Sequence, residues 1–167
     1  MNKMEKIKNT IDSNKLQILL AIFVLLAAFY ISLNFYQFML IQGESMVPAY
    51  HNLQLVILDK HTDDYTYGDV IAFRCEGLNA VLVKRIVACP GDSVIIREGI
   101  LYVNGEVSTI FPSDCQFDYA GIAETEMELD TEQYFVIGDN IGESKDSRYQ
   151  EVGRVDEMTI LGEIIVP

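Results

Sequence analysis

The chain has few of the residues on which several common functions depend. It has two histidines, His51 and His61, and neither a C-x-x-C motif nor a histidine–cysteine cluster, so no metal site is indicated. Basic residues are also scarce, because 12 lysines and arginines stand against 25 aspartates and glutamates. That balance argues against nucleic-acid binding, which needs a basic face. We therefore expect no metal ion, cofactor or nucleic acid to take part in the function.

Cysteines are too few to form a dense disulfide scaffold. The three are Cys75, Cys89 and Cys115, and an odd number leaves at least one thiol unpaired within a monomer. One disulfide is compatible with the sequence, and its pairing stays open, as does the oligomeric state. A cysteine nucleophile is disfavoured, since only two histidines are present to serve as its imidazole partner.

Formal charge is absent from Leu16 to Gly43. A membrane-spanning helix needs about 20 apolar residues, and residues 16–41 supply them, with tyrosine and phenylalanine near the end as in an interfacial aromatic belt. The alternative is a cleaved secretory signal, whose apolar core runs only about 7–15 residues. No small-x-small motif closes this longer run, so we predict a retained transmembrane anchor over residues 16–41.

The charges on either side of this segment predict its orientation. Four lysines and two acidic residues precede it, whereas 8 basic and 23 acidic residues follow. The positive-inside rule then places residues 1–15 in the cytoplasm and residues 42–167 outside the cell membrane. The expected organisation is a single-pass membrane protein with an extracytoplasmic domain.

The outer domain has the pattern of a mainly β fold. Short aliphatic runs alternate with turn signals, of which Asn104-Gly105 is the strongest. No helical period of comparable strength occurs outside the anchor. Residues 109–132 are acidic and weakly periodic, and we interpret them as a loop-rich insertion. The sequence predicts an antiparallel β-sheet or partial barrel behind one transmembrane helix, with strands at 53–58, 70–74, 80–88, 93–97, 100–103, 133–137 and 159–166.

Ser45 lies four residues beyond Ile41, at the predicted exit from the membrane. A serine hydroxyl becomes a useful nucleophile only with a neighbouring base and an oxyanion site. Gly43 permits close backbone approach, and Pro48 stiffens the segment that follows. His51 is six residues further on, but no orienting carboxylate accompanies it in a recognisable pattern, so we interpret His51 as a surface residue.

Lys84 is the candidate base. Strand alternation places it on one face with Leu82 and Ile86, and places Arg85 on the other. Burial among aliphatic side chains lowers a lysine pKa by up to about 3–5 units, and a lysine near about 7–8 is able to act as a general base. The alternative is a lysine that extends its ammonium group to water from a strand edge.

A polar block at residues 138–148 follows the last of the central apolar strands. Such a cluster is usually a hydrogen-bonded turn. A calcium-binding EF-hand loop starting at Asp139 would need an oxygen ligand where Ile141 stands, so that motif fails. We expect a polar network at a strand end, with Arg148 paired to either Asp139 or Asp146.

Taken in order, these blocks resemble the type I signal peptidases, the membrane-bound Ser–Lys endopeptidases that remove signal peptides from exported proteins. The resemblance covers the chain outside residues 109–132, and the short length and single span are similar to those of the Gram-positive members. The blocks that carry it are the N-terminal anchor, Ser45-Met46-Val47-Pro48, Tyr67-Gly68-Asp69-Val70, Lys84-Arg85-Ile86-Val87 with Pro90-Gly91-Asp92, and Gly138–Arg148.

The resemblance implies a role for each matching residue. Ser45 would be the nucleophile, with its backbone N–H as one oxyanion donor, and Lys84 would be the base. Ser144 would help to hold the lysine amine, while Asp146 and Arg148 would shape the site through hydrogen bonds and an ion pair. The other implied residues are Asp139 and Asn140, which would support that loop, and Met46, Val47 and Pro48, which would contact the substrate.

The implied partners are the lipid bilayer and membrane-held preproteins with small residues at positions −1 and −3 before the cleaved bond. Alanine, valine, isoleucine or leucine from the strands near the dyad would line shallow pockets for them. Three positions depart from the pattern. Ala49 replaces a usual threonine, and Cys89 replaces an aliphatic residue. Gly43, like the glycine of many Gram-positive members, stands where some members have a serine as a second oxyanion donor, so the second donor stays open.

Two other functions compete with this one. A self-cleaving repressor of the LexA type also uses a Ser–Lys dyad on a β fold, but it would carry a DNA-binding helix-turn-helix where this chain has an apolar segment. A catalytically silent, membrane-anchored β-domain that assists pilin or exported-protein assembly would be expected to lose Ser45 or Lys84, and this chain retains both. The sequence leaves open which precursors are cut.

Overall fold

The structure is a computed structural model that describes residues 3–112 and 114–166, without the side chains of residues 3–14, 31, 33 and 166. Residues 1–2 of the predicted cytoplasmic segment therefore lie outside the described residues. The chain forms two units, Met1–Tyr36 and Gln37–Pro167.

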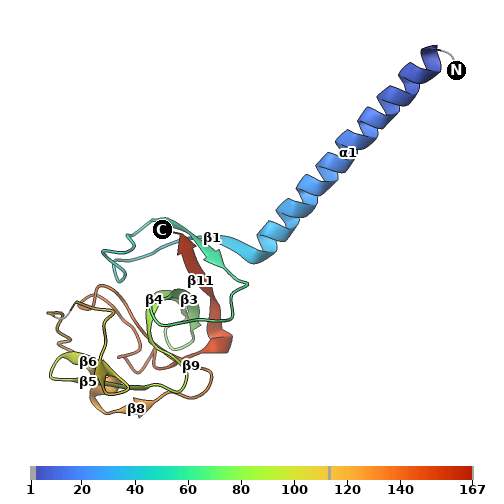
Figure 1. Cartoon of the computed structure of the whole chain (residues 1–167). Coiled ribbons are helices and arrows are strands. Elements are labelled where there is room, and N and C mark those ends of the chain that lie inside the picture. The colour runs from blue at the N-terminus through green and yellow to red at the C-terminus, as the bar shows by residue number, and fades with distance from the viewer. Residues whose placement is uncertain (1–2, 113, 167) are drawn as a thin grey trace. The chain divides into compact units, whose positions relative to one another are not determined.

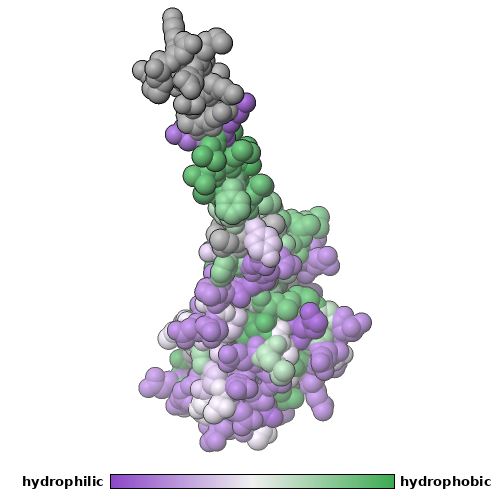
Figure 2. Space-filling view, turned by 90° about the vertical axis from the view of Figure 1, so that its right-hand side faces the viewer, coloured by the Kyte–Doolittle hydropathy of each residue, from purple (hydrophilic) through white to green (hydrophobic). Residues whose placement is uncertain are grey.

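The first unit contains the long helix α1, Lys3–Phe35 (Figure 1). Apolar side chains predominate where its side chains are described (Figure 2), and many of them are exposed, for example Leu19 at 64% and Phe23 at 68%. Within the described part of the chain, we find no helix with the length and apolar character needed to cross a membrane.

The helix ends before the C-terminal boundary of the predicted anchor. Residues Tyr36–Leu40 form strand β1 instead, and Ile41 is only 3% exposed in the core of the second unit. The apolar residues at the end of the run 16–41 thus belong partly to the β domain. Hydropathy could not reveal this, since a buried strand and an anchor need the same side chains.

The second unit consists of two antiparallel sheets (Figure 1), which confirms the predicted mainly β, antiparallel fold. The larger sheet has the order β1-β2-β11-β3-β4-β9-β10, and the smaller has the order β7-β6-β5-β8. The remaining strands are β2 Leu55–Asp59, β3 Val70–Cys75, β4 Ala80–Ala88, β5 Ser93–Arg97, β6 Ile100–Val103, β7 Glu106–Val107, β8 Met127–Glu128, β9 Gln133–Ile137, β10 Val155–Asp156 and β11 Ile160–Val166, and two short 3-10 helices span Gly121–Glu124 and Glu157–Thr159.

Strand β4 is only half enclosed by its neighbours. On one side β3 pairs along it from Ala80 to Arg85. On the other side β9 pairs only with its C-terminal part, from Arg85 to Ala88. Among the described residues, the N-terminal half of β4 therefore keeps one edge without a partner strand, and Lys84 lies where the pairing with β9 stops.

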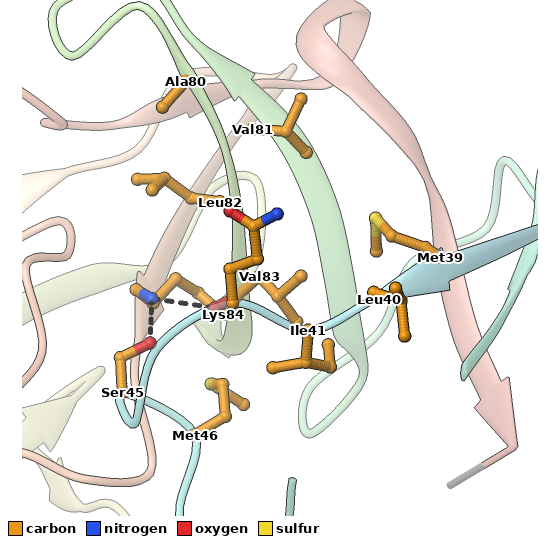
Figure 3. Close-up of a pocket in the computed structure, with 11 residues that line it drawn as sticks. Met39, Leu40, Ile41, Ser45, Met46, Ala80, Val81, Leu82, Val83 and Lys84 are labelled. Carbon is orange, nitrogen blue, oxygen red and sulfur yellow. Dashed lines mark hydrogen bonds between the residues drawn. The ribbon is translucent and has the colours of Figure 1, made fainter. Parts of the chain in front are cut away.

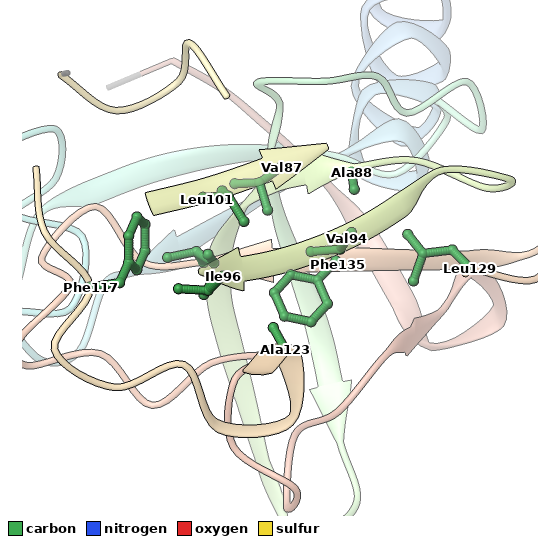
Figure 4. Packing of buried hydrophobic residues seen from close by; sticks show 10 residues of the cluster. Val87, Ala88, Val94, Ile96, Leu101, Phe117, Ala123, Leu129 and Phe135 are labelled. Atoms are coloured by element: carbon green, nitrogen blue, oxygen red, sulfur yellow. The ribbon is translucent and has the colours of Figure 1, made fainter. Parts of the chain in front are cut away.

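The main hydrophobic core lies between the two sheets' strands and the segment predicted as an insertion (Figure 4). Phe117, Ala123 and Leu129 from residues 109–132 are buried in it. The segment is mostly loop, but it also contributes β8 and one of the 3-10 helices. Its irregular spacing of apolar residues conceals these core positions from a periodicity argument.

A second cluster fixes the turn that carries Ser45. Met46, which follows Ser45 directly, is 1% exposed and packs with Ile41, Val56 and Leu58. Burying a methionine side chain is worth about 1.5–3 kcal/mol. The turn is therefore held against β2 by its own neighbouring side chain.

Candidate active site

Ser45 and Lys84 are brought together by the fold. Ser45 lies in the turn between β1 and β2, and Lys84 lies on β4. Lys84 Nζ donates a hydrogen bond of 2.7 Å to Ser45 Oγ and another of 2.8 Å to the carbonyl oxygen of Val83. Figure 3 shows the amine and the hydroxyl facing one another. This is the hydrogen-bond distance that proton transfer between a nucleophile and its base requires.

Lys84 is buried, with only 3% of its surface exposed. The alternative of a lysine that extends to water is therefore wrong. Burial lowers the pKa of Lys84 from 10.5 to about 8, although the negative charges of Asp146 and Asp139 oppose this shift. An amine with such a pKa is partly neutral near physiological pH, so it is able to accept a proton.

The Ser45 turn is bound to the loop that follows β9. The backbone N–H of Asn140 donates to the carbonyl oxygen of Ser45 at 3.0 Å. The side-chain amide of Asn140 donates to the carbonyl oxygen of Glu44 at 3.0 Å. Residues far apart in the sequence thus hold the backbone on both sides of the hydroxyl.

The charged residues of that loop form two separate ion pairs. Arg148 Nε and Nη2 donate to the two carboxylate oxygens of Asp146, at 2.8 and 2.9 Å. Of the two partners that the sequence allowed for Arg148, the structure thus selects Asp146. Asp139 pairs with Arg85 instead, through hydrogen bonds of 2.7 and 2.6 Å.

Arg85 is a site residue that sequence reasoning missed. Strand alternation placed its side chain on the face opposite Lys84, so the sequence did not connect it with the site. The signal that could have revealed a role is its charge within an otherwise apolar strand. Its partner Asp139 is 54 residues away along the chain. Only the pairing of β4 with β9 brings the two together.

The Asp146–Arg148 pair organises the interior of the loop. Arg148 is 2% exposed and its Nη2 also donates to the carbonyl oxygens of Ile141 and Ser144, at 2.8 and 3.3 Å. The backbone N–H of Gly138 donates to Asp146 Oδ2 at 3.1 Å. Since buried charges are stable only when paired and hydrogen-bonded, these contacts hold the loop in one conformation.

Ser144 lies in the same loop and is 3% exposed. Its hydroxyl oxygen is buried without a hydrogen-bond partner among the residues that the structure describes. The contact with the Lys84 amine that the resemblance implies is thus not formed in this arrangement, and it stays a prediction. Gly138 packs so closely against Ser144 Oγ that no Cβ fits at that position.

A cavity of about 440 Å³ opens beside the dyad (Figure 3). The end of β1 and the N-terminal half of β4 form its walls, and aliphatic side chains predominate. Of the residues expected to contact substrate, Met46 lines it, whereas Pro48 lines another cavity together with Ala49 and Arg85. The lining residues are Met39, Leu40, Ile41, Gln42, Ser45, Met46, Ala80, Val81, Leu82, Val83 and Lys84.

Val47, the third residue expected to contact substrate, is partly buried and is not among those lining either cavity. Conversely, Met39 and Leu40 line the cavity beside the dyad, although hydropathy alone assigned them to the membrane anchor. The chain changes from helix to strand after Phe35, and Met39 and Leu40 line the cavity because they lie at the end of that strand.

The other candidate nucleophiles and bases lie outside this arrangement. His51 is exposed, as predicted. Cys75, Cys89 and Cys115 are all free thiols. Burial raises the pKa of Cys89 to about 11, so this thiol stays protonated and unreactive near neutral pH.

Residues 15–167 match the family described as "Signal peptidase, peptidase S26". Signal peptidase I U of Bacillus subtilis (strain 168) is 30% identical, over 97% of this chain and 88% of the relative. Signal peptidase I of Bacillus licheniformis is 29% identical, over 74% of this chain and 71% of the relative. A crystal structure of a signal peptidase I from Enterococcus faecalis V583 is 24% identical, with a TM-score of 0.49, and covers 61% of this chain and 97% of that one.

Proposed function

The chain belongs to the signal peptidase family, peptidase S26, and from that premise we propose that it cleaves signal peptides from exported preproteins with a Ser45–Lys84 dyad. The observation that carries the assignment of the dyad is the 2.7 Å contact between a buried lysine amine and the serine hydroxyl. No other pair of nucleophile and base in the described residues combines such contact with a pKa shifted towards neutrality.

The chemistry follows from the protonation state of Lys84. When the amine is neutral, it accepts the proton of Ser45 Oγ as the oxygen attacks the scissile carbonyl carbon, which gives a tetrahedral oxyanion. The ammonium group then donates that proton to the departing amine, and an acyl-enzyme remains. A water molecule then gives a proton to the same amine as it attacks the ester carbonyl, and the ammonium group returns that proton to Ser45 Oγ as the ester bond breaks, which releases the signal peptide and restores the dyad.

The cavity beside the dyad supports an extended substrate with small apolar side chains. The unpaired edge of β4 lies along it, and a free strand edge binds a peptide by adding it as a further strand. The walls that Ile41, Leu82 and Val83 contribute are aliphatic. Small residues before the cleaved bond would fill this space, and the substrate would thereby present its carbonyl carbon to Ser45.

We further propose that the apolar segment that begins at Leu16 holds the enzyme in the cell membrane. Large apolar side chains of α1 are exposed along its described part, and no formal charge occurs between Leu16 and Gly43. The lysines before Leu16 favour a cytoplasmic N-terminus and an extracytoplasmic catalytic domain. A preprotein held in the bilayer by its own signal sequence would then meet Ser45 near the membrane surface.

The test is cleavage of a signal-bearing precursor by the purified full chain in detergent or lipid. Ser45→Ala and Lys84→Ala should each abolish release of the mature protein, since loss of a nucleophile or base costs on the order of 10⁶ in kcat in a serine peptidase. Matched controls are Ser108→Ala and Lys145→Ala, which alter a surface hydrogen bond with Tyr67 and an exposed ion pair. Both should cleave like the wild type.

Two results would count against the assignment. A folded wild-type protein that cleaves no precursor would favour the catalytically silent domain. Full cleavage by the folded Lys84→Ala variant would instead show that Lys84 is not the base. Circular dichroism of each variant establishes that the fold is retained.

A further inference from the structure

Asn140 holds the two peptide units that flank the Ser45 α-carbon. Its backbone N–H donates to the carbonyl oxygen of Ser45, and its side-chain amide donates to the carbonyl oxygen of Glu44, both at 3.0 Å. Because a carbonyl oxygen only accepts, the side-chain atom that faces Glu44 is the amide nitrogen. One residue therefore fixes the orientation of the peptide planes before and after the nucleophile.

This contact dictates where the Ser45 N–H points. The carbonyl of Glu44 and the N–H of Ser45 belong to the same peptide unit, which is trans. In a trans unit the two groups point in opposite directions. With its oxygen turned towards Asn140, the unit directs its N–H away from Asn140. That N–H has no hydrogen-bond partner in the part of the chain that the structure describes, so it is available to a substrate oxygen.

The peptide unit has little else to hold it. The unit turns about the Glu44 Cα–C and Ser45 N–Cα single bonds, and both residues lie in an irregular turn rather than in a helix or strand. Glu44 is exposed, and its carbonyl oxygen accepts one other hydrogen bond, from the Val47 N–H at 3.2 Å. Without the Asn140 side chain, a rotation of this unit would turn the Ser45 N–H away from its present direction.

Asn140 is itself rigidly placed. The residue before it, Asp139, makes two hydrogen bonds with Arg85 on β4. The Asn140 carbonyl oxygen accepts the Glu143 N–H at 3.1 Å, which closes a turn. Through Asn140 and the Asp139–Arg85 ion pair, the Ser45 peptide is thus held in a fixed orientation relative to β4, the strand that also carries Lys84.

We propose that Asn140 is a positioning residue that keeps the Ser45 N–H aimed at the developing oxyanion. It touches neither the substrate nor Lys84 in this role, which rests on the proposed peptidase function. Gly43 supplies no side-chain donor to the oxyanion site, so that site depends more on the Ser45 N–H, whose direction the Asn140 side chain sets. The oxyanion site of this chain would accordingly depend on a contact from the loop after β9.

Asn140→Asp is the sharpest variant, because it preserves shape and the backbone N–H but replaces the side-chain donor with an acceptor. Asn140→Ala removes the donor without adding a charge. The matched control is Gln133→Glu, at the other end of β9, which makes the same amide-to-carboxylate change in an exposed hydrogen bond to Asp156. Steady-state cleavage of a signal-bearing precursor by the full chain in detergent gives kcat and KM for each.

Complete loss of an oxyanion donor costs about 10²–10³ in kcat, so misorientation should lower kcat by about 10- to 100-fold in both Asn140 variants. KM should stay within about twofold, since the ground-state substrate does not need the oxyanion site. A peptide aldehyde, whose adduct with Ser45 places an oxyanion at the same point, should bind Asn140→Ala more weakly by a similar factor. Gln133→Glu should match the wild type.

Three results would overturn the inference. The first is a wild-type kcat in Asn140→Ala. The second is a lower kcat with unchanged affinity for the aldehyde, and the third is a shift in the acid midpoint of the pH profile of Asn140→Ala, because either would mean that Asn140 acts on the dyad. A wild-type enzyme that cleaves nothing would refute the proposed function itself, so the two failures are distinguishable.

Discussion

Acidification should switch off cleavage by protonating Lys84. With a pKa of about 8, the amine is neutral in about 50% of molecules at pH 8, about 9% at pH 7 and about 1% at pH 6. A lysine that kept its ordinary pKa of 10.5 would be neutral in only about 0.3% at pH 8. At pH 8, the lowered pKa therefore raises the fraction of Lys84 that is neutral by a factor of about 150. We expect kcat/KM to fall about tenfold per pH unit below pH 7.

The pH at which kcat/KM falls to half its maximum on the acid side should depend on the charges around the Lys84 amine. Asp139 raises the pKa of Lys84 and opposes the effect of burial. Asp139→Asn removes that negative charge and leaves Arg85 as an unpaired cation, and both changes favour the neutral amine. The acid limb should therefore move to lower pH. Glu143→Gln is the matched control, since it removes an exposed carboxylate of the same loop that does not act on Lys84.

The assay is the pH dependence of kcat/KM between about pH 5 and 10, with a precursor whose own residues do not titrate near the cleaved bond. Circular dichroism at each pH establishes that the protein is folded. A profile that stays flat down to pH 5 would refute the lysine base. A limb that moves equally in Asp139→Asn and Glu143→Gln would refute the electrostatic reasoning but not the dyad.

Two further predictions concern the energetics of the site. The folded-state pKa of Lys84, about 8, lies below its ordinary 10.5, so burial of the ammonium group costs about 3 kcal/mol at and below pH 7, and the cost fades as pH rises from 8 to 10.5. Lys84→Met should therefore unfold at a higher temperature at pH 7 and lose most of that advantage near pH 10; an equal advantage at both would contradict the reasoning. Gly138→Ala should lower kcat at least tenfold by pushing its methyl group against Ser144 Oγ and the Ser45 carbonyl oxygen, whereas Gly142→Ala, with open space around it, should be neutral. Wild-type kcat in Gly138→Ala would show that the loop moves aside.

Local pattern was sufficient to predict the central β strands. Aliphatic runs between turn signals predicted the central strands, because side-chain period and turn chemistry are local properties. Lys84 was recognisable as unusual because it interrupts an apolar strand. The order of the blocks then supplied the family, since each block alone is short.

The sequence could not show where the apolar helix ends and the β domain begins within the apolar run 16–41. Met39 and Ile41 are as hydrophobic as the residues before them, so hydropathy assigned them to the anchor. In the structure they belong to the core or the cavity of the β domain. Whether an apolar residue faces lipid or a protein core depends on what packs against it, and that is decided by tertiary contacts.

By itself, the sequence determined the strand content and the uncharged apolar segment, which depend on neighbours within a few residues. The order of several blocks along the chain is what singled out Ser45 and Lys84 as the candidate dyad. Only the tertiary structure decided which groups meet. Lys84 donates a hydrogen bond to Ser45, which is 39 residues away in the sequence. Arg85 pairs with Asp139, which is 54 residues away, and the Asn140 side chain donates to the Glu44 carbonyl oxygen, which is 96 residues away. Such partners are selected by sheet register and loop packing, because burial leaves each polar group only the partner that the fold places within reach.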